Sequence, residues 1–208
     1  MYKVVFLDLC GTLVKENTTF DFFNRMILPK QPLLFKFIWR MKFAQVITKL
    51  LSMVSIKYDL TKIFCLYMMK GYSISELKDL SENYVKTLNW RHDVLKKVNL
   101  LVESGYTPVI VSASLSFIVE SVSQHLGIAK FQCSTPELYD GMFTGHLLTD
   151  LQGRKVDIIR AENASKSLFF TDNLDDINCK PNIHYFIAIS RIKNVSYWRR
   201  HKVITYVV

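Results

Sequence analysis

Four short apolar segments, separated by stretches of helical periodicity, constrain the fold of this chain more than any other feature of its sequence. Their β-branched and aromatic residues predict buried strands. They lie at residues 2–7, 107–111, 167–170 and 184–189. Strands that alternate with helices are typical of an α/β fold with a parallel sheet and right-handed crossovers. A further short strand is expected near the C-terminus, at residues 203–207.

Three of these predicted strands end in polar side chains. Asp8 follows the first strand, Ser112 follows the second and Asp172 follows the third. In open parallel sheets, ligands bind beyond the carboxyl ends of the strands. We therefore expect these three side chains to converge, although they are far apart in the sequence.

The chain between the first two strands is far longer than a crossover needs, and it reads as helices throughout. Ser73 and Glu76 form a capping box at the start of the last helix. The helices are predicted at residues 20–27, 33–56, 60–69 and 73–89. We expect a small helical cap domain at residues 16–90, inserted into a core domain of residues 1–15 and 91–208.

Composition narrows the class of protein. Half of the residues are hydrophobic, which excludes a disordered chain, and the formal net charge of +9 favours anionic partners such as phosphorylated metabolites, anionic lipids or nucleic acid. The four cysteines form no Cys-x-x-Cys pair, so neither a zinc site nor a disulfide scaffold is expected. No apolar run of signal-peptide length precedes Asp8. These features favour a cytoplasmic protein.

Four sequence elements stand in a fixed order along the chain. They are Asp8-Leu9-Cys10-Gly11-Thr12-Leu13, Val111-Ser112-Ala113-Ser114, Gly153-Arg154-Lys155 and Thr171-Asp172-Asn173-Leu174-Asp175-Asp176. They resemble the four motifs of the haloacid dehalogenase (HAD) superfamily. The helical insertion after the first motif resembles the phosphoserine-phosphatase-like subgroup. The resemblance covers nearly the whole chain and implies a Rossmann-like, doubly wound parallel sheet with an inserted helical cap.

The resemblance also implies a phosphoryl-transfer site. Asp8 would be the nucleophile that forms an aspartyl-phosphate, and Lys155 would balance negative charge in the transition state. The metal site would hold Mg2+ through Asp8, Asp172 and the backbone carbonyl of Cys10. Asp176 would orient either the metal shell or Lys155. The implied substrate-binding residues are Thr12, Glu16, Ser112, Ala113 and Asn173, with Ser112 bonded to a phosphoryl oxygen.

The first motif departs from the family pattern at Cys10. The family's phosphatases place a second Asp there, which protonates the leaving group and later activates water. A thiol is a poor general acid at neutral pH, and loss of a general acid or base lowers the rate by about 10²–10⁴. We expect a slow or atypical phosphatase or phosphotransferase. The alternatives are a catalytically silent domain that binds a phosphorylated ligand or protein partner, and a different Asp8-centred reaction such as dehalogenation, which the retained Asp172 and Asp176 disfavour.

The predicted cap offers further alternatives. Glu16 either contacts the substrate or belongs to a polar turn with Thr18 or Thr19 as N-cap. Residues 33–56 are rich in apolar and basic residues, which fits cap packing or peripheral contact with the inner face of a membrane, but their charges exclude a bilayer span. The basic cluster at residues 197–202 is expected to be a solvated helix end, so we expect no nucleic acid partner. The expected substrate is a phosphorylated small molecule or lipid.

Overall fold

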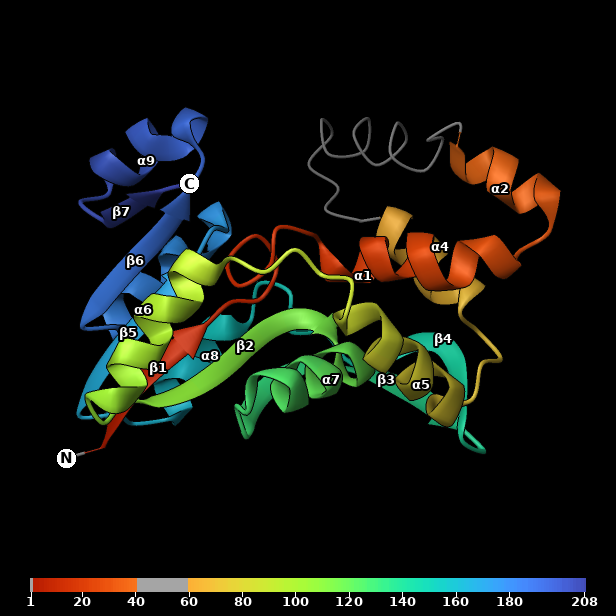
Figure 1. The fold of residues 1–208 in the computed structure, drawn as a ribbon, viewed down its shortest axis with the longest axis horizontal. Coiled ribbons are helices and arrows are strands. Elements are labelled where there is room, and N and C mark those ends of the chain that lie inside the picture. The colour runs from red at the N-terminus through yellow and green to blue at the C-terminus, as the bar shows by residue number, and fades with distance from the viewer. Residues whose placement is uncertain (1, 41–59) are drawn as a thin grey trace.

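A seven-stranded sheet forms the centre of the computed structural model, which describes residues 2–40 and 60–208 (Figure 1). The strand order is β4-β3-β2-β1-β5-β6-β7. All neighbours are parallel except β3 and β4, which form an antiparallel pair. The strands are β1 (Lys3–Leu7), β2 (Thr107–Leu115), β3 (Lys130–Tyr139), β4 (Met142–Thr149), β5 (Lys166–Thr171), β6 (Tyr185–Ser190) and β7 (Ile204–Val207). The predicted Rossmann-like parallel sheet and its five predicted strands are confirmed.

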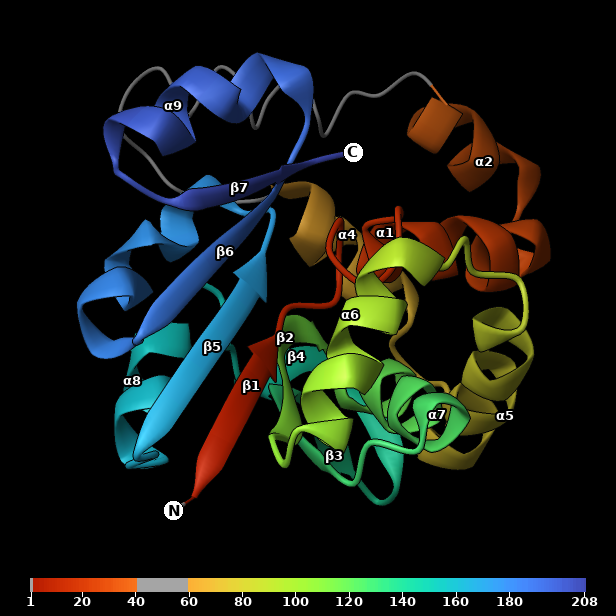
Figure 2. The same cartoon turned by 60° about the vertical axis from the view of Figure 1, so that its left-hand side comes forward.

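The central strand β1 is apolar on both faces because helices cover both sides of the sheet. Val5 and Leu7 belong to a core with helices α6 (His92–Glu103) and α7 (Ser116–Leu126). Val4 and Phe6 belong to a second core, with α8 (Lys155–Ala161) and α9 (Val195–Arg200). Figure 2 shows α6 and α8 on either side of β1 and β5. This double cover explains why β1 reads as a continuous apolar run.

Residues 16–40 and 60–90 contribute the helices on the right-hand side of Figure 1, next to the β4 end of the sheet. The predicted capping box is present, since the Ser73 side chain accepts from Glu76 N and the Glu76 side chain accepts from Ser73 N. The elements are α1 (Thr18–Phe22), a π-helical turn (Phe23–Ile27), a 3-10 turn (Leu28–Lys30), α2 (Leu33–Arg40), α4 (Leu60–Met68) and α5 (Ile74–Val85). Of the helix predicted at residues 33–56, α2 forms the first part, and the rest lies outside the described residues.

The two connections between core and insertion lie side by side. Val14 and Trp90 form an antiparallel bridge, Lys15 N donates to Asn89 O at 3.1 Å, and Arg91 N donates to Leu13 O at 2.8 Å. The chain therefore leaves the core and returns to it at neighbouring points, and the division at residues 15/16 and 90/91 stays a prediction. The insertion also touches the core elsewhere, because α5 packs against α7, with an ion pair of 2.8 Å between Lys78 and Glu120.

The β3–β4 hairpin was not predicted from the sequence. Its turn is formed by Asp140 and Gly141, whose φ angles are 49° and 75°. An Asp-Gly pair with both residues at positive φ is a favoured hairpin turn. Pro136 within β3 weakens the strand pattern, since proline is rare inside strands. The Asp-Gly pair was the signal that could have revealed the hairpin.

Apolar side chains of α2 are exposed, with exposed fractions of 82% for Leu33, 67% for Leu34 and 61% for Phe37. In the described part of the chain, no helix combines the length and the apolar character that a membrane span requires.

Candidate active site

The carboxyl ends of β1, β2 and β5 meet at a cavity of about 620 Å³. Asp8, Ser112 and Asp172 all line it, so the predicted convergence of these three residues is confirmed. Segments of the insertion contribute Glu16, Phe20 and others to the wall. The cavity therefore lies between the strand ends of the core and the inserted helices.

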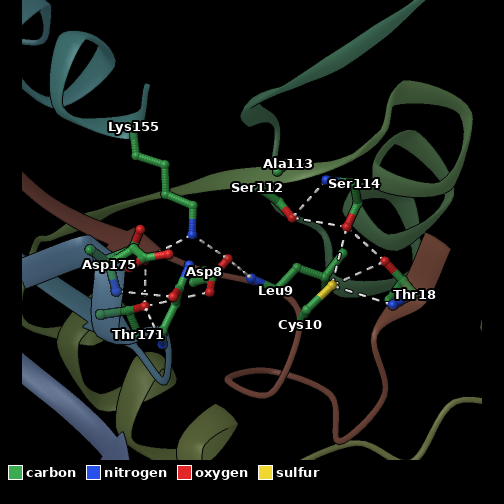
Figure 3. Close-up of polar contacts among 12 residues, drawn as sticks. Asp8, Leu9, Cys10, Thr18, Ser112, Ala113, Ser114, Lys155, Thr171 and Asp175 are labelled. Atoms are coloured by element: carbon green, nitrogen blue, oxygen red, sulfur yellow. Dashed lines mark hydrogen bonds and ion pairs between the residues drawn. The ribbon is translucent and has the colours of Figure 1, made fainter. Parts of the chain in front are cut away.

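A buried lysine joins two of the acidic residues (Figure 3). Lys155 begins α8, and its Nζ lies 2.7 Å from Oδ1 of Asp8 and 2.8 Å from Oδ2 of Asp176. Thr171, the last residue of β5, donates to the same Asp176 oxygen at 2.6 Å. Leu9 N donates to Asp8 Oδ1 at 2.9 Å, while the hydrogen bond that Asp8 Oδ2 accepts within the described residues is a long one, 3.4 Å from Thr171 Oγ1. Lys155 thus fixes one oxygen of Asp8 and leaves the other available.

Burial and the neighbouring charges shift the pKa values of the ionisable groups in this cluster. Burial raises the pKa of Asp8 to about 6, and the charge of Asp176 adds to this while Lys155 opposes it. Burial raises the pKa of Asp172 to about 7, and repulsion from Asp8 adds to the shift. Burial alone would lower the pKa of Lys155, but the carboxylates of Asp8 and Asp176 outweigh it and raise that pKa. Lys155 is therefore a permanent cation, and the pair Asp8 and Asp172 favours a further positive charge.

Gly11 allows Asp172 to approach the loop after β1. A Cβ atom built on Gly11 would lie 2.0 Å from Asp172 Oδ2, and the φ angle of Gly11 is +70°. A side chain at this position would collide with the carboxylate. The glycine therefore lets the Asp172 carboxylate pack directly against the Asp8 loop.

Replacing Gly11 with Ala should displace Asp172. Left-handed backbone costs a residue with a Cβ about 1–2 kcal/mol, and here the clash adds to it. Gly105 is the matched control, because its φ is +85° but, apart from Gly105 and its two chain neighbours, no described residue places an atom within 4 Å of a built Cβ. We expect Mg2+ to raise the melting temperature of the unaltered protein and of Gly105→Ala, but not of Gly11→Ala. Equal Mg2+ stabilisation of both variants would contradict this role of Gly11.

The end of β2 forms a bulge at the cavity wall. The pairing of β2 with β3 shifts between Ser112 and Leu115. Ser112 Oγ donates to Ser114 Oγ at 3.0 Å, and Ser114 N donates to Ser112 Oγ at 3.2 Å. Ser112, Ala113 and Ser114 all line the cavity. The bulge thus turns hydroxyl groups toward the space beside Asp8.

Cys10 contacts both the core and the insertion (Figure 3). Its Sγ lies 3.3 Å from Thr18 Oγ1 and 3.3 Å from Ser114 Oγ, and it accepts from Thr18 N at 3.3 Å. Thr18 and Ser114 are themselves hydrogen bonded at 2.6 Å. Burial raises the pKa of the Cys10 thiol, and the charge of Asp8 adds to this. The thiol is therefore neutral, and it is hydrogen bonded to the hydroxyl groups of Thr18 and Ser114.

The other predicted substrate-binding residues divide into two groups. Asn173 lines the cavity, and its side chain accepts from Asp175 N at 3.1 Å. Glu16 also lines the cavity, accepts from Asn89 N at 3.2 Å and pairs with Arg25 at 3.6 Å. Thr12 is fully buried and does not line the cavity, so its position does not support a substrate contact.

The turn that follows Glu16 differs from the prediction. Helix α1 begins at Thr18, with Asn17 as N-cap, rather than after Thr18 or Thr19. Asn17 makes no side-chain cap hydrogen bond. Cys10 Sγ instead accepts from the first helical N–H, that of Thr18. The first motif therefore holds the start of the insertion directly.

Basic residues at the cavity were missed in the sequence. Lys62 of α4, Lys15 and Arg191 all line it. Arg191 directly follows β6, and a polar residue at a strand end is the signal that marked Asp8 and Asp172. Lys62 lies in an otherwise apolar helix pattern, where an isolated lysine is the available signal.

A family model for haloacid dehalogenase-like hydrolases matches residues 5–179. The chain belongs to this family. Membership agrees with the site, because the match spans all four motifs whose side chains meet at the cavity. A search of curated proteins finds no match.

Solved structures share the fold of this family member at low sequence identity. A protein of unknown function from Bordetella pertussis Tohama I is 15% identical, with a TM-score of 0.77 over 99% of this chain and 98% of that one. A phospho-aspartyl intermediate analogue of phosphoserine phosphatase is 15% identical, with a TM-score of 0.64 over 100% and 93%. Cytosolic 5'-nucleotidase IIIB bound to cytidine is 14% identical, with a TM-score of 0.63 over 99% and 79%.

Proposed function

We propose that this hydrolase-family protein transfers a phosphoryl group from a phosphorylated small molecule or lipid to Asp8, with Mg2+ as cofactor, and that it turns over slowly. The observation that carries the proposal is the placement of Lys155, whose ammonium bridges Asp8 and Asp176 at the cavity beside Asp172. This arrangement presents one carboxylate oxygen to a ligand while a buried cation compensates negative charge.

The residues present fit a magnesium ion. The carboxylates of Asp8 and Asp172 and the backbone carbonyl of Cys10 are oxygen donors of the kind that Mg2+ prefers. Burial raises the pKa of Asp8 and of Asp172, so a bound divalent cation would stabilise the ionised form of both carboxylates. Within residues 2–40 and 60–208, no cluster of three or more His, Cys, Asp or Glu side chains could hold a metal ion. Such a small protein donor set suits Mg2+, which usually retains several waters.

Asp176 supports the site through Lys155 in this proposal. Its Oδ2 already accepts from Lys155 and Thr171. Of the two roles considered for Asp176, orientation of Lys155 fits these contacts better than orientation of the metal shell.

In the proposed reaction, an oxygen of Asp8 attacks phosphorus and the bond from phosphorus to the leaving-group oxygen breaks. Lys155 holds the Asp8 carboxylate in place and offsets the charge of the phosphoryl oxygens. Ser112 releases its contact with Ser114 and donates to a phosphoryl oxygen. Bound Mg2+ would supply charge neutralisation between the carboxylate and the phosphate. The product is an aspartyl-phosphate at residue 8.

Cys10 slows both halves of the reaction for an ordinary substrate, because departure of the leaving group needs an acid and hydrolysis of the aspartyl-phosphate needs a base. The neutral thiol holds its proton too tightly to protonate a leaving group and is too weak a base to activate water. A substrate with a good leaving group, or one that carries its own acid, would therefore phosphorylate Asp8 faster than water removes the phosphoryl group.

A silent domain that binds a phosphorylated ligand is the second candidate. The contacts of Cys10 with Thr18 and Ser114 favour this candidate. At the position where the family's phosphatases have an acid, the Cys10 thiol holds two hydroxyl groups and does not transfer a proton. Both candidates use the same anion site, and they differ in whether Asp8 becomes phosphorylated.

The test is covalent phosphorylation with an aryl phosphate, measured as the intact mass of the protein. We expect the mass of one added phosphoryl group in the presence of Mg2+, lability of that group to hydroxylamine, and no labelling after chelation of the metal. Sugar, amino-acid and lipid phosphates then identify the preferred substrate class. Labelling that persists without divalent metal would contradict the magnesium role, and no labelling with any donor would favour the silent domain.

A further inference from the structure

A chain of polar contacts connects the inserted helices to the core at the cavity. It begins at Lys62 on α4, a buried residue whose side chain lines the cavity. Its Nζ lies 2.9 Å from Oδ1 and 2.8 Å from Oδ2 of Asp150, and 3.2 Å from Oε1 of Gln152. Asp150 directly follows β4 and does not line the cavity. The pair therefore joins an inserted helix to a core loop beside the site.

Ser134 is the next contact in the chain. It is fully buried in β3, and its Oγ lies 3.1 Å from Oδ1 of Asp150 and 3.0 Å from the carbonyl oxygen of Ala113. The same Oγ accepts from Leu151 N at 3.0 Å. A serine hydroxyl has one proton to donate. Asp150 and Ala113 are thus two acceptors that compete for a single proton.

The Ala113 carbonyl belongs to the bulge at the end of β2. Ala113 and Ser114 fall between Ser112 and Leu115, where the pairing with β3 shifts. The Ser134 hydroxyl therefore holds, by a hydrogen bond, a segment of β2 that lacks regular backbone pairing with β3. This segment carries the Ser112 side chain at the cavity wall.

We propose that Lys62, Asp150 and Ser134 are positioning residues that set how firmly the β2 bulge is held. While Lys62 pairs with Asp150, the ammonium weakens the carboxylate as an acceptor, and the Ser134 proton is left to Ala113. If α4 moves away, the unpaired carboxylate becomes the stronger acceptor and takes that proton. The Ala113 carbonyl then loses the hydrogen bond that holds the bulge. The position of the insertion is thereby coupled to the geometry of the anion site. Only the identity of the anion rests on the proposed function.

The coupling predicts opposite effects for the two partners of one ion pair. Lys62→Met leaves Asp150 unpaired and should speed amide hydrogen exchange of residues 112–115 by about fivefold. Adding Asp150→Asn weakens the competing acceptor and should return exchange to within about twofold of the unaltered protein. If the ion pair had only a structural role, exchange would be faster in Lys62→Met and would stay faster after Asp150→Asn is added. Unchanged exchange in Lys62→Met, or failure of Asp150→Asn to restore it, would overturn the proposal.

Two further variants serve as controls. Ser134→Ala should speed exchange of the bulge and make it insensitive to Lys62→Met, because no proton remains to be shared. Lys78→Met removes the Lys78–Glu120 ion pair, which also joins an inserted helix to the core at 2.8 Å, but neither residue lines the cavity. It should leave exchange at residues 112–115 unchanged. An effect of Lys78→Met as large as that of Lys62→Met would overturn the specific route through Asp150.

Binding of inorganic phosphate with Mg2+, measured by calorimetry, reports the consequence for the site. Ser134 does not line the cavity, so an effect of Ser134→Ala on this affinity is indirect, and the hydrogen exchange of residues 112–115 in the same variant reports whether the bulge has changed. We expect about fivefold weaker binding for Ser134→Ala and unchanged binding for Lys78→Met. Equal affinity in Ser134→Ala and the unaltered protein would overturn the positioning role. If the unaltered protein binds no phosphate, the proposed function fails, while hydrogen exchange still decides the coupling.

Discussion

Replacing Asp8 with Asn should abolish covalent phosphorylation, with a loss of about 10⁴-fold or more, the order expected when a covalent nucleophile is removed. An amide oxygen keeps the shape of the side chain and still accepts from Lys155 and Leu9 N, but it is not a nucleophile of comparable strength. Intact mass after incubation with an aryl phosphate and Mg2+ measures the effect. The fold should persist, because Asp176 still pairs with Lys155.

The control for this variant is the same substitution at an aspartate that lies outside the cavity. Asp157 lies in α8, is exposed and does not line the cavity. Asp157→Asn should be phosphorylated like the unaltered protein. Retained phosphorylation in Asp8→Asn would place the nucleophile elsewhere and refute the proposed reaction.

Replacing Cys10 with Asp should raise steady-state release of phosphate by about 10²–10⁴. The surroundings of residue 10 suit a carboxylate, since Thr18 N, Thr18 Oγ1 and Ser114 Oγ all lie within 3.3 Å of the Cys10 sulfur. Burial and the charge of Asp8 would raise the pKa of an acid at this position, as they raise the pKa of the thiol. Such an acid could protonate a leaving group and then activate water.

Two measurements decide the Cys10 prediction. Release of phosphate from an alkyl phosphate, whose leaving group needs a proton, should increase most, and the aspartyl-phosphate should become shorter-lived. Cys10→Ser offers a hydroxyl of similar size without an acid, so it should show no such gain. An equal gain in Cys10→Ser, or no gain in Cys10→Asp, would show that the missing acid is not what limits turnover.

The sequence predicted the parts of the fold that depend on local patterns. Apolar runs with polar ends located β1, β2 and β5 and the side chains of Asp8, Ser112 and Asp172, because the ends of parallel strands share one edge of a sheet. The order of the motifs indicated the family. The hairpin of β3 and β4 was missed because Pro136 and the polar residues of β3 obscure its alternation.

Other features depend on contacts between distant residues and leave little local signal. Lys62 meets Asp150 only after α4 has packed over the end of β4. The close approach of Gly11 and Asp172 is likewise a product of the folded sheet. Cys10 was interpreted as a lost acid, but only the structure adds that its sulfur binds the first turn of α1.

The bridge between Val14 and Trp90 brings the beginning and the end of the inserted segment together. A segment whose two ends meet can be exchanged or resized without displacing β1 or α6, as is usual for tolerated domain insertions. In this protein, the carboxylates of Asp8 and Asp172 stand at strand ends of the core, whereas Glu16, Phe20 and Lys62 of the inserted segment contribute part of the cavity wall. We therefore expect changes in the inserted segment to alter which ligands fit the cavity without displacing Asp8.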